Sequence, residues 1–138
     1  MKIGNLELNG NVFPSACSSI TDGSYSELGA IFTKTITLEK RTGNTGKIFA
    51  KLTPNVSINR LGLPNNGPID YVYNILPKLS DVPIFTSIYG ENLGEYRRII
   101  EILNEFEKIK GIEVNLSCPN VDHNFYEYNY IYGLIESI

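Results

Sequence analysis

The sequence alternates short apolar runs, rich in β-branched and aromatic residues, with longer segments whose apolar residues recur at helical spacing. This alternation constrains the fold most strongly, because it is typical of βα units packed around a parallel sheet. After a hairpin-like start at residues 2–8, it predicts strands at residues 12–17, 30–35, 84–88 and 112–116. It predicts helices at residues 24–28, 68–79, 92–108 and 126–138, with Gly111 ending the third helix.

Two α/β architectures share this pattern, and periodicity alone leaves both open. One is an open doubly wound sheet. The other is the N-terminal half of a TIM (βα)8 barrel, since four strands and about as many helices make up half of its eight units. The chain has 138 residues, whereas a complete barrel typically has about 250. The polar stretch at residues 39–46 is expected to form an exposed loop over the mouth of a barrel.

The charge and cysteine content of the chain exclude several classes of binding partner. The 12 Lys and Arg residues and 15 Asp and Glu residues are interspersed and give a formal net charge of -3, so there is no basic stripe for nucleic acid or anionic lipid. No window approaches the roughly 18 apolar residues of a membrane span. Neither Cys17 nor Cys118 has a second Cys or His at ligand spacing, so no metal site is expected. A cytoplasmic protein with a small-molecule ligand is predicted.

Polar residues at the ends of the predicted strands are the candidates for a site, because α/β folds bind ligands at the carboxyl ends of their strands. Lys34 ends the second strand, where a cation is costly without a polar or anionic partner, and a ligand-facing role is favoured over that of a snorkelling edge lysine. A lone cysteine such as Cys118 is usually a small buried hydrophobe. Its neighbours Asn115, Pro119 and Asn120 instead favour the rim of a polar pocket.

Three strings carry a resemblance to a known family. They are TKTITLEKRTGN at residues 33–44, SINRLGLPN at residues 57–65 and NLSCPNV at residues 115–121. In order and spacing they resemble the signature of the dihydroorotate dehydrogenases. The resemblance implies an FMN-dependent barrel enzyme that oxidises dihydroorotate to orotate in pyrimidine biosynthesis. The cysteine at position 118 makes the chain similar to the class 1 enzymes, which are soluble and carry cysteine there. The membrane-associated class 2 enzymes carry serine at this position.

The resemblance also implies roles for individual residues. Cys118 matches the catalytic base, and Lys34 matches a lysine between flavin and substrate. The implied substrate-binding residues are Lys34, Asn59, Leu61, Gly62, Leu63, Asn115 and Asn120. The implied flavin-binding residues are Ala16, Cys17, Ser18, Lys34, Thr35, Ser87 and Asn115. The family usually has Ala-Ser-Gly where this chain has Ala16-Cys17-Ser18, so a Cβ stands where the flavin contact often uses glycine.

Only the N-terminal half of a barrel is expected, so residues 1–138 are interpreted as a single partial domain. The second half would hold the FMN phosphate, and the expected partner is therefore a C-terminal half-barrel or another copy of the chain. A non-catalytic half-barrel that self-associates or regulates is the main alternative. A second is the pyrimidine-reducing domain of dihydropyrimidine dehydrogenases, although Asn120 fits it less well. The electron acceptor, either fumarate or NAD through a partner subunit, is left open.

Overall fold

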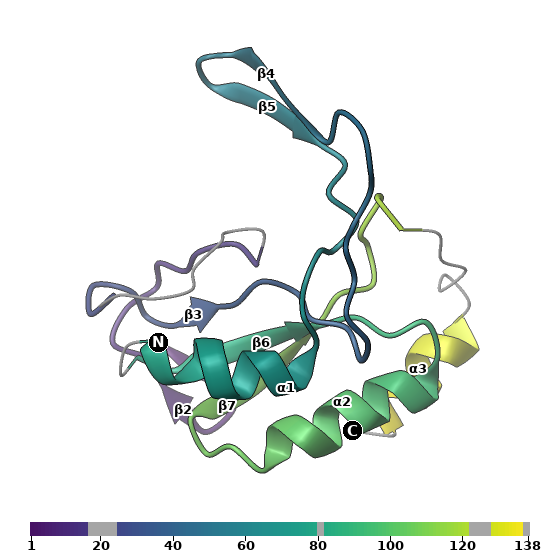
Figure 1. The fold of residues 1–138 in the computed structure, drawn as a ribbon. Helices are drawn as coiled ribbons and strands as arrows, with labels where there is room; N and C mark the ends of the chain where they lie inside the picture. The colour runs from purple at the N-terminus through teal and green to yellow at the C-terminus, as the bar shows by residue number, and fades with distance from the viewer. Residues whose placement is uncertain (17–24, 80–81, 122–127, 137–138) are drawn as a thin grey trace.

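A three-stranded parallel sheet forms the centre of the computed structural model, which describes residues 1–16, 25–79, 82–121 and 128–136. Its strands are β3 (Ile31–Phe32), β6 (Ile84–Ile88) and β7 (Ile109–Val114), in the order β3-β6-β7. The pairing of β3 with β6 is continued beyond the short strand, because the backbone N–H of Ile36 donates to the Ser87 carbonyl at 2.9 Å. The predicted α/β class with a parallel sheet is confirmed (Figure 1).

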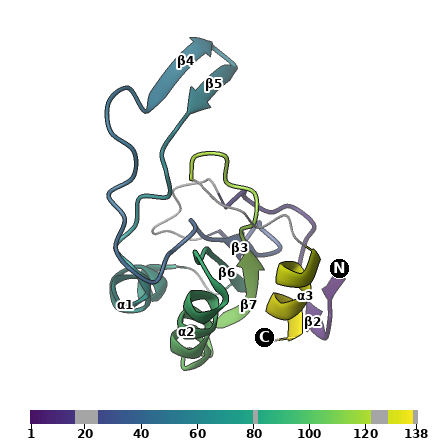
Figure 2. The ribbon, with the colours of Figure 1, turned by 90° about the vertical axis from the view of Figure 1, so that its right-hand side faces the viewer.

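The other elements of the described residues are two antiparallel hairpins and three helical segments. The hairpins are β1 (Lys2–Ile3) with β2 (Leu6–Glu7), and β4 (Phe49–Thr53) with β5 (Val56–Asn59). The helical segments are α1 (Pro68–Asp70) continued by η1 (Tyr71–Ile75) and η2 (Leu76–Lys78), then α2 (Leu93–Asn104) and α3 (Tyr128–Glu136). The β4–β5 hairpin stands away from the rest of the molecule, and α1 and α2 lie side by side on one face of the sheet (Figures 1 and 2).

The helix α2 is the element that the sequence predicts best. Its N-cap is Asn92, whose side-chain oxygen accepts the backbone N–H of Glu95 at 3.1 Å, the usual way to satisfy a donor of the first turn. Its apolar stripe is buried, with Ile99 and Leu103 almost inaccessible to solvent. The helix ends at Asn104 and not at Lys108, and Gly111, which was predicted to end it, lies inside β7 instead.

The predicted helix at residues 68–79 is present but changes its hydrogen bonding along its length. It begins with Pro68, which suits the first turn because its missing N–H would have no helical acceptor there. It becomes a π-helix at Tyr71–Ile75, where the Leu76 N–H donates to the Tyr71 carbonyl, and ends as a 3-10 turn. Pro77 accounts for the change, since it has no N–H and its ring clashes with the carbonyl four residues before it.

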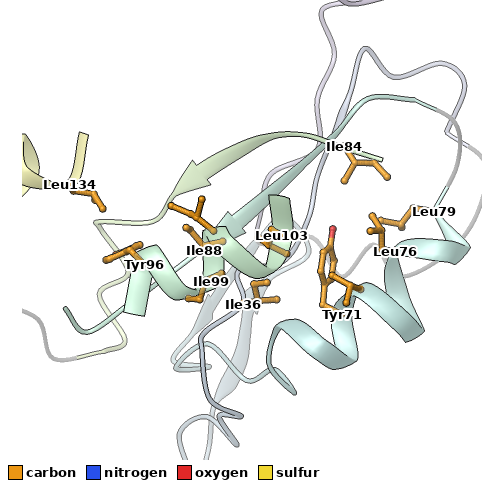
Figure 3. Packing of buried hydrophobic residues seen from close by; sticks show 12 residues of the cluster. Ile36, Tyr71, Leu76, Leu79, Ile84, Ile88, Tyr96, Ile99, Leu103 and Leu134 are labelled. Atoms are coloured by element: carbon orange, nitrogen blue, oxygen red, sulfur yellow. The ribbon is translucent and has the colours of Figure 1, made fainter. Parts of the chain in front are cut away.

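The core fills the space between these helices and the sheet (Figure 3). Ile84 and Ile88 contribute fully buried side chains from β6, and Leu134 brings α3 into the same cluster. A polar contact also lies inside the core, where the Tyr71 hydroxyl is 3.0 Å from Thr86 Oγ1. Burial raises the pKa of Tyr71 above its usual value of 10, so this phenol stays neutral and bonded.

Several predicted elements are wrong in their type or bounds. Residues 12–16 form no strand, which fits the absence of a donor at Pro14, and Cys17 lies outside the described residues. Residues 25–28 form a turn closed by the Leu28 N–H on the Tyr25 carbonyl, and Ser24 also lies outside the described part. The fourth strand starts three residues earlier than predicted, at Ile109. The final helix is confirmed over 128–136.

Replacement of Gly111 by alanine is expected to destabilise the fold by roughly 1–3 kcal/mol, the usual cost of overpacking. A Cβ at Gly111 would lie 2.5 Å from two atoms of the Phe85 ring, which is stacked on Phe32 at a centroid distance of 4.9 Å and cannot easily turn away. Urea unfolding followed by circular dichroism measures the change. Gly133→Ala is the matched control, because its nearest neighbour would be 3.6 Å away; equal stability of the two variants would contradict the prediction.

Candidate active site

A pocket of about 770 Å³ opens at the carboxyl ends of β3 and β7. Its walls come from residues 13–16, from β3 and the residues after it, from the last residue of β5 and residues 61–64 after it, and from residues 113–120. In Figure 2 the segment that follows β7 rises toward the two segments that lead to the β4–β5 hairpin. The predicted site residues that line this pocket are Ala16, Lys34, Thr35, Asn59, Leu61, Gly62, Leu63, Asn115, Cys118 and Asn120.

Of the remaining predicted residues, Ser87 does not line the pocket in the described structure. Ser87 is fully buried below it, on β6, and reaches the pocket only through its contact with Thr35. Cys17 and Ser18 lie outside the described residues. Ala16, which precedes them, is half-buried in the pocket wall.

Asn115 is held in place by a chain of buried polar groups. Its side-chain Nδ2 donates to Thr35 Oγ1 at 3.0 Å, and Thr35 Oγ1 is 2.9 Å from Ser87 Oγ. Its backbone carbonyl accepts the hydroxyl of Tyr96 at 3.2 Å. Because β6, α2 and the segments that follow β3 and β7 each supply one of these groups, Asn115 has a fixed position before any ligand arrives.

The wall at residues 59–63 has an unusual backbone. Gly62 and Leu63 both have positive φ, 72° and 56°, and a side chain at Leu63 makes that conformation costly. Asn59 Oδ1 accepts the Leu61 N–H at 3.4 Å and the Asn120 side-chain amide at the same distance. The two asparagines predicted for substrate binding are therefore within hydrogen-bonding distance of each other across the pocket.

Asn65 supports this wall from behind, and the sequence analysis assigned it no role. Its Oδ1 accepts the backbone N–H of Gly67 at 2.9 Å and of Thr37 at 3.2 Å, while its Nδ2 donates to the Leu63 carbonyl at 2.8 Å. These bonds stabilise the positive φ of Leu63. The one available signal in the sequence is Asn65 followed by Asn66 and Gly67, which is typical of a turn and says nothing of these partners.

Two charged side chains lie among the residues that line the pocket, Lys34 and Glu113. Both are half-buried, and no ion pair within 4 Å joins either of them to another residue of the described part of the chain. The sequence analysis missed Glu113. The signal was present, because residues two apart on a strand share a face and Glu113 precedes Asn115 by two positions.

Next to the pocket, Arg41 anchors the polar loop at residues 39–46. Its guanidinium bonds Glu91 Oε1 at 2.9 Å and lies 5.9 Å from the centre of the Tyr89 ring. Burial raises the pKa of Tyr89 above its usual value of 10, the negative charge of Glu91 raises it further, and Arg41 opposes both. Tyr89 therefore remains a neutral phenol beside the loop, where it cannot act as a base near neutral pH.

Comparison with known proteins identifies the family. The model of a family described as dihydroorotate dehydrogenase matches residues 10–129. The chain belongs to the dihydroorotate dehydrogenase family. The three strings of the sequence analysis therefore carry a genuine relationship, and they supply Lys34, Asn59 and Cys118 to the pocket.

Curated dihydroorotate dehydrogenases are similar to the chain over most of its length. A dihydroorotate dehydrogenase B (NAD(+)) catalytic subunit from Brachyspira hyodysenteriae is 39% identical over 122 residues, covering 83% of this chain and 40% of the relative. The corresponding subunit from Desulforudis audaxviator is 45% identical, covering 68% and 31%. A dihydroorotate dehydrogenase A (fumarate) from Lacticaseibacillus paracasei is 42% identical, covering 68% and 33%. The chain thus spans two fifths or less of these relatives.

The relatives confirm the class 1 prediction, since the dihydroorotate dehydrogenases A and B are the class 1 types. Their names also include both electron acceptors that the sequence analysis left open, NAD(+) and fumarate. In the described ranges of the chain, no helix has both the length and the apolar character needed to cross a membrane.

Proposed function

We propose that the chain forms the N-terminal half of an FMN-dependent (βα)8 barrel that oxidises dihydroorotate to orotate in pyrimidine biosynthesis. The observation that supports this most directly is the meeting of Cys118, Lys34 and the three asparagines in one pocket at the carboxyl ends of parallel strands. The sequential order β3-β6-β7 also fits a barrel, in which each strand neighbours the next one along the chain.

In the proposed reaction, Cys118 is the general base. Its thiolate would remove the proton from ring carbon five of dihydroorotate as the substrate gives up a hydride from carbon six. Bound FMN supplies the hydride acceptor. A thiol gives up its proton more readily than a hydroxyl and its thiolate is the reactive form, so a cysteine suits the role of base. Cys118 is half-buried on the segment after β7 and lines the pocket.

The pocket supplies complementary groups for the rest of the substrate. The Lys34 ammonium would pair with the substrate carboxylate and favour negative charge on the flavin. Each amide of Asn59, Asn115 and Asn120 offers a donor and an acceptor to the alternating carbonyl and N–H groups of the pyrimidine ring. Asn115 is fixed in advance by Thr35, which reduces the entropy lost when the ring binds.

The pocket fits the ring system of a flavin better than its phosphate. Its volume lies within the roughly 300–1,000 Å³ typical of cofactor sites, and Phe13 and Phe32 give it an apolar wall beside the polar edge at Lys34. No helix contributes to the described lining, and Lys34 is its one cation. A phosphate usually requires a helix N-terminus or further cations, so we propose that it is bound by a C-terminal half-barrel.

Reconstitution tests this proposal. The chain is co-expressed with the portion of the Brachyspira hyodysenteriae catalytic subunit that lies outside the aligned segment, and the product is called the reconstituted protein below. It is expected to purify with a flavin absorbance spectrum and to form orotate from dihydroorotate with a dye as electron acceptor. Each half alone is the control. Absence of both the flavin spectrum and orotate formation would contradict the proposal.

A non-catalytic, self-associating half-barrel is the second candidate. It is favoured by the exposed apolar residues of the β4–β5 hairpin, where Phe49, Leu52 and Ile58 are each more than half exposed. It is also favoured by the short strand β3, which pairs only with β6 in the described sheet and so leaves an open edge. Size-exclusion chromatography of the chain alone discriminates the two, because this candidate requires a stable dimer that does not take up FMN.

A further inference from the structure

Asn44 lies in the polar loop at residues 39–46 and joins the two walls of the pocket without lining it. Its side-chain Nδ2 donates to the Arg60 carbonyl at 2.9 Å and to the Asn120 carbonyl at 3.2 Å. Both protons of the amide nitrogen are therefore used, one on each wall. Its own backbone N–H donates to the Leu61 carbonyl at 2.9 Å, which adds a second bond to the wall at residues 59–63.

The fit around Asn44 is close. A Cβ built at Gly62 would come within 2.8 Å of Asn44 Cγ and 2.9 Å of its Oδ1, so the amide is packed against the bare backbone of Gly62. Gly62 has φ of 72°, a conformation that glycine adopts without strain. The backbone of the wall and the Asn44 amide are thus closely complementary in shape.

We propose that Asn44 is a positioning residue, which sets the distance between the two walls and so aligns Asn59 with the segment that carries Cys118 and Asn120. This inference rests on the proposed function of the pocket. Asn44 contacts the backbone of Arg60, next to Asn59, and the backbone of Asn120, two residues after Cys118. Asn120 Nδ2 meets Asn59 Oδ1 at 3.4 Å only while the walls keep this spacing.

The test is Asn44→Asp, which keeps the size of the side chain but removes both donors and places a carboxylate against two carbonyls. In the reconstituted protein, orotate binding is expected to weaken about tenfold, the loss of roughly two hydrogen bonds. The dissociation constant of FMN is expected to stay within twofold, because the flavin-lining residues Ala16 and Thr35 lie on other segments and Asn115 is held by its own bond to Thr35. Orotate binding is measured by calorimetry and FMN binding by flavin fluorescence.

A second measurement needs neither ligand. Alkylation of Cys118 by iodoacetamide, followed by peptide mass spectrometry that separates it from Cys17, is expected to become several-fold faster in Asn44→Asp, because the released segment is more accessible. Asn55→Asp in the β4–β5 turn is the control, since it makes the same charge change at an exposed position away from the pocket lining.

The outcomes separate this inference from the proposed function. Failure of the unsubstituted reconstituted protein to bind orotate and FMN would contradict the proposed function, while the alkylation rate still decides the role of Asn44. Unchanged orotate binding together with an unchanged alkylation rate in Asn44→Asp would overturn the inference. Loss of FMN binding along with orotate binding would also overturn it, because Asn44 would then serve the fold as a whole.

Discussion

Cys118→Ala is expected to lower the rate of orotate formation by the reconstituted protein about 10²–10⁴-fold, the usual contribution of a positioned general base. The reason is that alanine offers no group to take the proton from ring carbon five. Binding should change little, because the walls on either side are held by other contacts, such as the bond between Asn120 and Asn59. Initial rates at saturating dihydroorotate, followed by orotate absorbance, measure the change.

Cys118→Ser is the matched control for this prediction, because it keeps the shape of the side chain but has a hydroxyl that ionises far less readily than a thiol. Its rate near neutral pH is expected to fall with that of Cys118→Ala, while both variants retain a flavin spectrum and bind orotate within about threefold of the original protein, a difference of well under one kcal/mol. A Cys118→Ala protein with an almost unchanged rate would show that another group is the base.

The sequence predicted those elements whose own residues determine their structure. Strand β6 is a short run rich in β-branched and aromatic residues that is buried along its whole length, and α2 has both a capping residue and an apolar stripe. The β4–β5 hairpin was missed because it is stabilised by the pairing of its own two strands, with residues such as Leu52 and Ile58 left exposed. Such an element has no stripe of core-facing apolar residues from which it could be predicted. The switch to a π-helix before Pro77 likewise depends on one missing donor.

The residues of the site also differ in how far the sequence could predict them. The residues proposed to touch the substrate, such as Lys34 and Cys118, stand at strand ends in recognisable strings, so a family resemblance identified them from sequence alone. The residues that hold those strings in place act through backbone atoms far away in sequence. Asn44 bonds a carbonyl 76 positions later, and Asn65 bonds a backbone N–H 28 positions earlier. Side-chain identity carries little information about such partners, and only the folded chain reveals them.

Lys34→Met is expected to lower kcat/KM for dihydroorotate about 10²-fold or more, comparable with the loss of one preorganised group that stabilises developing charge. Methionine keeps the length and the apolar stem of the side chain and removes only the cation. Lys110→Met, at an exposed position near the start of β7, makes the same charge change away from the pocket and is the control. Steady-state kinetics of the reconstituted proteins measure the effect, and an equal, small effect of both substitutions would contradict the prediction.

The second charged side chain in the pocket allows a further test of this prediction. When Lys34 is removed, Glu113 becomes the one charged side chain among the described lining residues, so the carboxylate of the substrate meets a pocket of its own sign. Neutralising it with Glu113→Gln in the Lys34→Met background is therefore expected to recover part of the lost orotate affinity, since a like-charge repulsion in a half-buried site is removed. The recovery should shrink as salt is added if the repulsion acts partly through solvent. If the double variant binds orotate no better than Lys34→Met, Lys34 acts by direct contact with the substrate and the net charge of the pocket is not important.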